Sequence, residues 1–414
     1  MKHFPLTPTV SANYVGGEAA TRPDLLARLA AAQTQRAHDD LLRHLHTVDQ
    51  VHAPCIVMDR RTLLDFASND YLGLAQHPAV REALIDSANH TGVGARAAHL
   101  LGGHHANHAA LEDKLATWTG RERALLLSTG YMANLGVLGT LIGKGDVCVQ
   151  DKLNHASLLD GARLSYATLK RYAHADVGAA RRQLRSCPAQ AAMLATDGVF
   201  SMDGDVAPLR ELAALCETEH AVLMVDDAHG LGVLGPDGAG SLAAAGIDQQ
   251  AAPVLMATLG KALGVSGAFV AGSSALIDGL VQFARSYIYT TAMPAPLAAA
   301  ASAAVDVARA DAERRQQLQK NIAQFRDGAA ARGMALMSSS TPIQPIVVGT
   351  SAKALAVSRQ LLDAGFHVPA IRPPSVAAGQ ARLRISLCAL HKHSHIERLL
   401  DALAAALSAN VKMH

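Results

Sequence analysis

Short apolar runs alternate with amphipathic stretches through the middle of the chain. Six runs are predicted to be strands: Ala124–Leu127, Asp146–Val149, Ala191–Ala195, Ala221–Val225, Val254–Ala257 and Ala268–Ala271. Helical stretches separate them, such as Pro208–Glu219, which carries proline in its first turn. Runs that are apolar throughout are typical of strands buried on both faces. The pattern therefore predicts an α/β fold, with a large, mostly parallel sheet and helices on both faces.

The ends of the chain show different patterns. Leucines at helical spacing over residues 24–50 predict an N-terminal helix. A long charged helix is expected over 298–332, followed by a strand at 343–348, a helix at 352–364, a strand at 381–387 and a helix at 396–407. We therefore divide the chain into an N-terminal segment with a helix (1–67), a large domain (68–310) and a smaller C-terminal α/β domain (311–414).

Composition narrows the class of protein. Half of the 414 residues are apolar, and the formal net charge of +2 gives no basic block for nucleic acid. Residues 1–23 lack the apolar segment of a signal peptide, and the alanine-rich stretch 292–305 is too weakly apolar to span a bilayer. The five cysteines form no C-x-x-C pair, which fits a reducing compartment. A cytoplasmic enzyme without a membrane or nucleic-acid partner is expected.

Polar residues directly after the predicted strands are the candidates for chemistry, because sites in such sheets gather at the carboxyl ends of strands. Asp226 and His229 follow one strand, and Lys261 follows the next between two glycines. A buried acid needs a partner, and the nitrogen of a pyridinium ring is one possibility. The alternatives are a turn aspartate and a surface lysine. Because Asp226 stands at the end of the preceding strand, a Schiff-base lysine is a better interpretation of Lys261 than a surface lysine.

Three other loops carry candidate residues. Ser128-Thr-Gly130-Tyr131 opens a helix, and free N–H groups at a helix start can hold a phosphate. An ordinary strand-to-helix turn would look the same. His155 could stack on a flat ring or stand beside a helix cap, and Ser201 lies in a polar loop that could reach a cofactor or be purely structural.

Histidines are concentrated at two places, His104/His105/His108 and His391/His393/His395. Either group could bind a metal ion, but no nearby cysteine or matched acid completes a ligand set in the sequence. No metal site is therefore predicted.

Six segments in order resemble the α-oxoamine synthases, which are fold-type I enzymes dependent on pyridoxal 5'-phosphate (PLP). These segments are S-N-D-Y-L-G-L (68–74), S-T-G-Y-M-A-N (128–134), N-H-A-S (154–157), D-G-V-F-S-M-D-G-D (197–205), V-D-D-A-H-G-L-G-V-L-G (225–235) and T-L-G-K-A-L-G (258–264). The resemblance extends from about residue 24 to the end. It implies a PLP-dependent acyltransferase that joins an amino acid to an acyl thioester and releases carbon dioxide.

The resemblance also implies roles for individual residues. Lys261 would hold PLP as a Schiff base, Asp226 would pair with the ring nitrogen, and His229 would contact the phenolic oxygen. His155 would stack on the ring and touch the substrate. Further cofactor contacts are expected from Gly130, Tyr131, Ser201, Thr258 and Thr290. Substrate contacts are expected from Arg43, Asn69, Arg372, Ser375 and Arg384, of which Arg384 would clamp the amino-acid carboxylate.

Within the family, Ile371–Val376 followed by Ala381–Ser386 is most similar to the branch that condenses L-alanine with a pimeloyl thioester in biotin biosynthesis. Leu259, Ser375 and Ala377 depart from the residues frequent there, so another pair, such as glycine with acetyl-CoA or succinyl-CoA, stays open. The resemblance further implies a homodimer with shared active sites, in which Tyr289–Thr291 would reach the phosphate of the neighbouring subunit.

Overall fold

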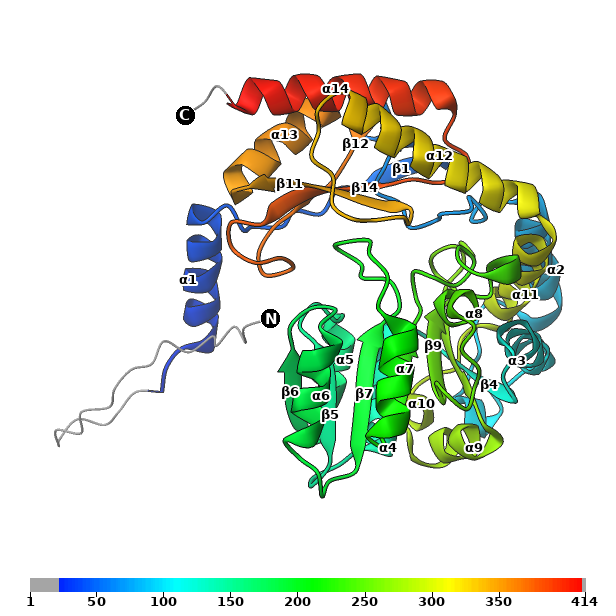
Figure 1. Ribbon diagram of the computed structural model, residues 1–414. Coiled ribbons are helices and arrows are strands. Elements are labelled where there is room, and N and C mark those ends of the chain that lie inside the picture. Colours follow the sequence, from blue (N-terminus) through cyan, green and yellow to red (C-terminus); the bar gives the residue numbers. More distant parts are fainter. Residues whose placement is uncertain (1–21, 412–414) are drawn as a thin grey trace.

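A seven-stranded sheet forms the centre of the computed structural model, which describes residues 22–411 (Figure 1). Its strands are β4 (Arg123–Leu127), β5 (Val147–Asp151), β6 (Thr168–Tyr172), β7 (Ala192–Asp197), β8 (Val222–Asp226), β9 (Val254–Thr258) and β10 (Ala268–Gly272). They lie in the order β4-β10-β9-β8-β7-β5-β6, and β10 runs antiparallel to both of its neighbours. All six predicted strands are present, and the predicted fold class is confirmed.

Helices cover both faces of this sheet, as the apolar runs predicted. Alternate residues of one strand enter different cores: Leu125 and Leu127 pack in one cluster and Leu126 in the other. The helices of this part are α2 (Pro78–Thr91), α3 (Ala106–Thr119), α4 (Gly130–Leu141), α5 (Ala156–Leu164), α6 (Val177–Arg185), α7 (Leu209–Thr218), α8 (Ser241–Ala245), α9 (Ser274–Phe283), α10 (Arg285–Ile288) and α11 (Ala295–Ala310). Burial on both sides fixes the orientation of the strands, and with it the edge at which their carboxyl ends meet.

Strand β6 was not predicted. Its sequence, Thr-Leu-Lys-Arg-Tyr, contains no apolar run. It pairs only with β5 and forms an edge of the sheet, where one side of the strand is left to solvent. Edge strands tolerate polar and charged residues, so the search for apolar runs passed over it.

A smaller α/β layer packs above the large sheet (Figure 1). It contains α12 (Ala312–Ala331), β11 (Ile343–Gly349), α13 (Ser351–Asp363), β12 (Phe366–His367), β13 (Ala370–Ile371), β14 (Ala381–Ser386) and α14 (His393–Val411). Strands β11, β14 and β13 form one sheet. A second sheet joins β1 (Val48–His52), β2 (Cys55–Met58) and β3 (Arg61–Asp65) to β12, so the N-terminal segment and the C-terminal part share hydrogen bonds. The exact division into three domains stays a prediction.

Two predicted helices have different bounds. Helix α1 (Leu25–His38) begins at Asp24, whose side chain accepts from the backbone N–H groups of Leu26 and Ala27. It ends twelve residues before the predicted limit, because Arg372 binds the carbonyls of Asp40 and Leu42 and holds them in a non-helical course. The long charged helix is in fact two helices, α11 and α12. Asp311 lies between them and caps the second by accepting from the N–H of Arg314.

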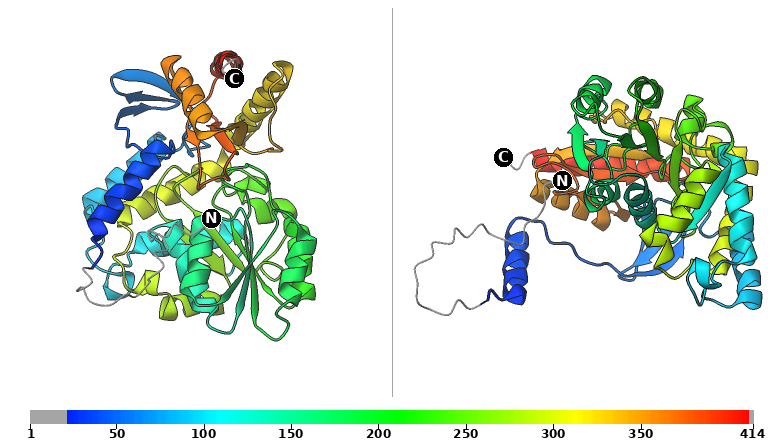
Figure 2. Two further views of the ribbon diagram at one scale, coloured as in Figure 1. Left: turned by 90° about the vertical axis from the view of Figure 1, so that its left-hand side faces the viewer. Right: turned by 90° about the horizontal axis from the view of Figure 1, so that it is seen from below.

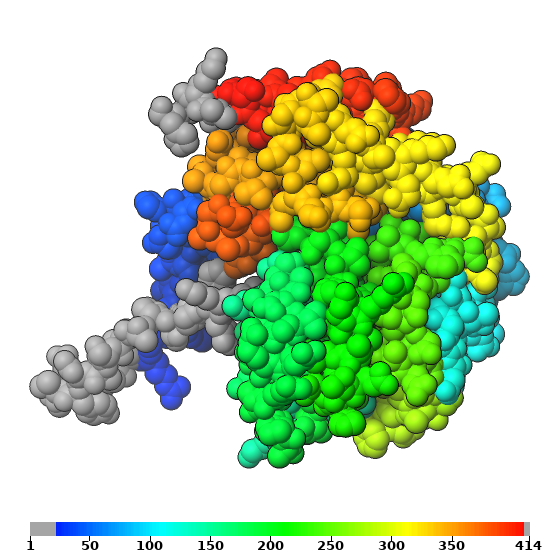
Figure 3. Space-filling model, in the orientation of Figure 1, coloured from blue at the N-terminus to red at the C-terminus, as the bar shows by residue number. Residues whose placement is uncertain are grey.

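Helix α1 stands at the margin of the molecule and contains no buried residue (Figures 2 and 3). Residues 1–21, expected not to form a signal peptide, lie outside the described part. Within residues 22–411, no helix combines the length and the apolar character that crossing a membrane requires.

Candidate active site

A cavity of about 200 Å³ opens at the carboxyl ends of the central parallel strands. Eight residues predicted from the sequence line it together: Gly130, Tyr131, His155, Ser201, Asp226, His229, Thr258 and Lys261. They end or follow β4, β5, β7, β8 and β9, whose carboxyl ends lie at the same edge of the sheet. The fold therefore gathers residues that are up to 131 positions apart.

Lys261 reaches into this cavity from the loop after β9. Its Nζ lies 2.8 Å from Nε2 of His229. Burial lowers the pKa of Lys261 to about 8, although the carboxylates of Asp226 and Asp197 oppose the shift. A substantial fraction of this amine is therefore neutral near physiological pH, and a neutral amine can act as a nucleophile or accept a proton.

His229 connects Lys261 to a second group of residues. Its Nδ1 lies 2.7 Å from the hydroxyl of Tyr71, which is fully buried. The guanidinium of Arg384 donates to that hydroxyl over 3.3 Å and to Oδ1 of Asn69 over 3.1 Å. Burial, with the positive charges of Lys261 and Arg384, lowers the pKa of His229 well below its ordinary value. His229 is thus a neutral imidazole with one nitrogen facing the lysine and one facing the tyrosine.

Arg384 itself is almost fully buried and held from several sides. Its Nε donates to the carbonyl of Ser201 over 2.7 Å, and its Nη1 donates to Oγ of Ser386 over 2.9 Å. The predicted substrate residues Asn69 and Arg384 are therefore brought together, beside the cavity rather than in its lining.

Asp226 presents a buried carboxylate at the end of β8. Its Oδ2 accepts from the amide of Asn134 over 2.7 Å, and its Oδ1 accepts from the backbone N–H of Ala228 over 3.1 Å. Asn134 also donates to Oγ of Ser157, which lies 2.7 Å from Nδ1 of His155. Burial lowers the pKa of His155, while Asp226 opposes that shift. One network therefore orients both the carboxylate and the imidazole that face the cavity.

Helix α4 begins at the cavity wall. Thr129 caps it by accepting from the N–H of Met132, so the first turn, with Gly130 and Tyr131, points its N–H groups toward the cavity end. The phenol of Tyr131 donates to Asp160 over 2.6 Å. The hydroxyl of Thr258 donates to the carbonyl of Gly267 over 2.9 Å, so it has to give up that bond before it can donate to a phosphate.

A second cavity, of about 680 Å³, lies between the segment after α1 and helix α13. Three predicted substrate residues line it: Arg43, Arg372 and Ser375. Arg372 uses its guanidinium on backbone carbonyls of residues 40 and 42, whereas Arg43 is exposed. Thr290 follows α10 and lines neither cavity. Apart from Thr290, the predicted site residues thus fall into one group at the central cavity and one group at the second cavity.

Comparison with known proteins identifies the family. The family described as aminotransferase class I and II matches residues 61–403. The chain is 52% identical over 381 residues to an 8-amino-7-oxononanoate synthase of Cellvibrio japonicus, covering 92% of this chain and 96% of the relative. It is 48% identical over 390 residues to a synthase of the same name from Xylella fastidiosa, covering 94% and 97%.

The chain belongs to the 8-amino-7-oxononanoate synthases, within the aminotransferase class I and II family. Among solved structures, a serine palmitoyltransferase from S. paucimobilis with a bound PLP–myriocin aldimine has a TM-score of 0.89 at 29% identity, covering 94% of this chain and all of that one. An 8-amino-7-oxononanoate synthase from Francisella tularensis has a TM-score of 0.74 at 30% identity, covering 84% and 99%. The fold is that of the fold-type I PLP enzymes, and the expected cofactor class is confirmed.

The residues of the central cavity fit PLP as this family uses it. The cofactor has an aldehyde, a ring nitrogen, a phenolic oxygen and a phosphate. The cavity offers an amine on Lys261, a carboxylate on Asp226, an imidazole on His229 and the first turn of α4. The Asn134 bond keeps the carboxylate of Asp226 oriented within the cavity lining. Each polar part of the cofactor therefore has a partner of matching chemistry.

The residues of this site that were missed in the sequence include Tyr71 and Asn134. Both stand inside motifs quoted for the family, S-N-D-Y-L-G-L and S-T-G-Y-M-A-N. Their place inside these motifs was the signal that could have identified them. Neither follows a strand directly, so the search at strand ends did not select them.

Proposed function

We propose that this chain catalyses the PLP-dependent condensation of L-alanine with a pimeloyl thioester, releasing carbon dioxide, as the 8-amino-7-oxononanoate synthase of biotin biosynthesis. One observation carries the proposal: the amine of Lys261 faces His229 beside the Asp226 carboxylate, in a chain 52% identical to a synthase of that name. The thioester carrier is coenzyme A or an acyl-carrier protein.

When bound, PLP supplies an aldehyde that bonds to amines and a ring that delocalises the electron pair left when a bond to the α-carbon breaks. Asp226 would keep a proton on the ring nitrogen, which a carboxylate held by Asn134 and Ala228 is suited to do. His155 would cover the ring, and the N–H groups at the start of α4 would hold the phosphate. Ser201 and Thr258 would make further contacts, and Thr290 would reach the phosphate bound by the neighbouring subunit.

Lys261 is the proposed base that takes the α-proton of alanine. Its lowered pKa of about 8 makes the neutral amine available near neutral pH. His229, 2.8 Å away, orients that amine and can exchange a proton with it. Arg384 would clamp the carboxylate of alanine, with Asn69 beside it. To do so, Arg384 would turn N–H groups away from Tyr71 and Asn69, which are its present partners.

The second cavity is the proposed place for the acyl side of the reaction. A pimeloyl group ends in a carboxylate, and Arg43 with Arg372 places two guanidinium groups there. The two arginines differ in their availability to a ligand. Arg372 already donates to backbone carbonyls, whereas Arg43 is exposed. We therefore propose that Arg43 binds the terminal carboxylate. Arg372 would hold in place the segment that carries Arg43. Ser375 would contact the acyl chain.

A homodimer with shared active sites belongs to the same proposal. Leu25 and Leu26 on α1 are 67% and 76% exposed, and Tyr289 beside Thr290 is 72% exposed. Large apolar side chains on an otherwise unpacked helix favour contact with a second subunit. A cytoplasmic location is supported by five free cysteines.

A substrate panel tests the proposal. The holoenzyme is incubated with paired amino acids and acyl-CoAs, and thiol release is measured together with the product mass. L-alanine with pimeloyl-CoA is expected to exceed glycine with acetyl-CoA or succinyl-CoA. Serine with palmitoyl-CoA is included because serine palmitoyltransferases share the fold. If any of the other pairs is the better substrate, the assignment to the aminotransferase class I and II family stands and the biotin reaction is wrong.

A further inference from the structure

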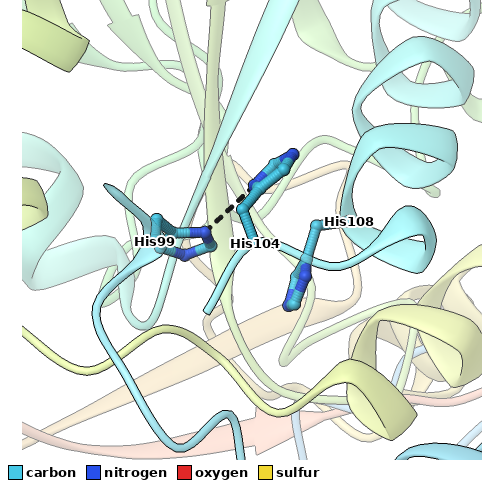
Figure 4. A group of neighbouring side chains, drawn as sticks. All are labelled: His99, His104 and His108. Atoms are coloured by element: carbon cyan, nitrogen blue, oxygen red, sulfur yellow. Dashed lines mark hydrogen bonds between the residues drawn. The ribbon is translucent and has the colours of Figure 1, made fainter. Parts of the chain in front are cut away.

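Three histidines converge near the start of α3 (Figure 4). His99 begins the short helix η1 (His99–Leu101), His104 lies in the following loop, and His108 lies in the first turn of α3. One nitrogen from each ring falls within 4.8 Å of those of the other two. Nδ1 of His99 and Nδ1 of His104 are 3.2 Å apart. None of the three lines either cavity described above.

The remaining nitrogens point outward. Nε2 of His108 lies 2.7 Å from the carbonyl of Met293, to which it can donate. Nε2 of His104 lies 3.7 Å from Oε2 of Glu112. A carbonyl and a carboxylate are the usual partners behind metal-binding histidines, because they leave the lone pair of the opposite nitrogen free for the ion. The Glu112 contact leaves Nδ1 of His104 facing Nδ1 of His99, whereas Nδ1 of His108 faces the backbone N–H of His105.

Of the three histidines, His99 is the one with a buried ring nitrogen that no described residue hydrogen-bonds. It is 4% exposed, it stacks on Tyr287, and its Nε2 has no hydrogen-bond partner among the described residues. Burial lowers the pKa of His99 to about 4 and also lowers the pKa of His104 and His108, so the rings are neutral. Two neutral Nδ1 atoms at 3.2 Å need either a hydrogen or a cation between them. With the hydrogen on His99 Nδ1 its buried Nε2 is an acceptor without a partner, and with an ion at Nδ1 it is a donor without a partner, so this atom does not decide between the two.

We propose that His99, His104 and His108 bind one divalent transition-metal ion of the zinc class through their Nδ1 atoms. The 3.2 Å separation of the first two matches the roughly 3.3 Å edge of a tetrahedron with metal–nitrogen bonds of about 2.0–2.1 Å. The side chain of His104 is 34% exposed, which provides an entry path and a position for water as fourth ligand. Glu112 is the acid that the linear sequence did not pair with these histidines.

Binding requires one local exchange. Nδ1 of His108 now accepts from the backbone N–H of His105 over 2.8 Å, and the ion would take that lone pair. The ion would in return join η1, the following loop and α3. Through Met293 and the bond from Ala292 N–H to the carbonyl of Ala97, it would also anchor the segment before α11. We therefore expect the ion to stabilise the folded enzyme without entering the reaction.

The test uses the holoenzyme after removal of metal by a chelator. Zinc is titrated by calorimetry, and bound zinc is counted by mass spectrometry after gel filtration. Cobalt serves as the visible probe of a tetrahedral site. The wild type is expected to hold one ion per chain, to show the intense tetrahedral cobalt bands and to gain thermal stability with zinc. His99→Gln and His104→Gln should weaken zinc binding at least tenfold.

His393→Gln is the matched control, because His393 is exposed and lies outside the cluster. It should bind zinc as the wild type does. Equal zinc affinity in His104→Gln and in the control would overturn the proposal, as would a wild type without bound ion or tetrahedral cobalt bands. The cobalt spectrum needs no variant, so a variant that fails to fold does not remove the test.

Discussion

Nζ of Lys261 lies 2.8 Å from Nε2 of His229, and the opposite nitrogen of the same ring lies 2.7 Å from the hydroxyl of Tyr71. A continuous chain of polar contacts therefore runs from the proposed base through His229 and Tyr71 to Arg384, the proposed carboxylate clamp. The group that would take the proton from the α-carbon and the group that would hold the carboxylate on the same carbon are therefore joined by one imidazole and one phenol.

Lys261 should be the residue to which the cofactor is attached. Reduction of the holoenzyme with borohydride, followed by peptide mapping, is expected to find the pyridoxyl group on Lys261 alone. Capture of PLP by the apoenzyme should accelerate as pH rises through about 8, because the amine loses its proton there. An adduct on another lysine would refute the assignment.

Tyr71→Phe should change the hydrogen-bonding state of His229 without opening a cavity. The phenol loses its bonds to His229 and Arg384, and a buried hydrogen bond contributes about 1 kcal/mol, so we expect roughly a fivefold fall in kcat. The pH profile of kcat/KM should shift as well. In the apoenzyme, nitrogen NMR should report an altered tautomer balance of His229.

Tyr166→Phe is the control for that variant, because Tyr166 is 82% exposed. It should leave the rate, the pH profile and the His229 signals as in the wild type. If Tyr71→Phe leaves the pH profile and the His229 tautomer unchanged, the prediction is wrong and Tyr71 contributes only packing.

Asp226→Asn should retain the fold and lose at least tenfold in turnover. The amide cannot hold a proton on the ring nitrogen as a carboxylate does, and a charge-assisted hydrogen bond contributes about 1.5–3 kcal/mol. The amide also faces the Nδ2 donor of Asn134, now 2.7 Å from Oδ2. Steady-state thiol release measures the loss, and Asp278→Asn, at an exposed ion pair with Arg123, is the control. Near-normal turnover would rule out the proposed role.

His174 should stabilise the protein most strongly at low pH. Its ring lies 3.1 Å from Asp151 and 2.8 Å from Asp205, in the loop that carries Ser201. Burial alone would lower the pKa of His174, but the bonds to the two carboxylates outweigh it and raise the pKa to about 10. Because the folded-state pKa exceeds the ordinary 6.5, this contribution is complete below pH 6.5 and disappears as pH rises through about 10.

The melting temperature of His174→Gln should therefore fall well below that of the wild type at pH 6 and approach it at pH 9.5. A contribution of about 1–2 kcal/mol is expected for this partly exposed ion pair. His90→Gln, at an exposed position, should show no such trend. A deficit for His174→Gln that does not vary with pH would mean that the charge is unimportant.

The sequence by itself determined the class of fold and the central group of residues. Runs such as Val254–Ala257 are apolar throughout, and this burial on both faces can be recognised without coordinates. Lys261 and Asp226 were found because chemistry in parallel sheets follows strand ends, a rule that depends only on local order along the chain. The edge strand β6 was not predicted, because its pairing with β5 and not an apolar run in its sequence makes it a strand.

Only the tertiary structure decided how distant residues are grouped. Arg384, Tyr71 and His229 meet across as many as 313 positions, and no local periodicity records such a contact. The end of α1 depends on Arg372, which is more than 330 positions away, so propensity alone extended the helix too far. The histidine cluster is local by contrast, because His99 lies five residues before His104 and Glu112 lies four residues after His108 on the same helix. The long-range contacts arise from packing that involves the whole chain, whereas local patterns record only the burial of each element.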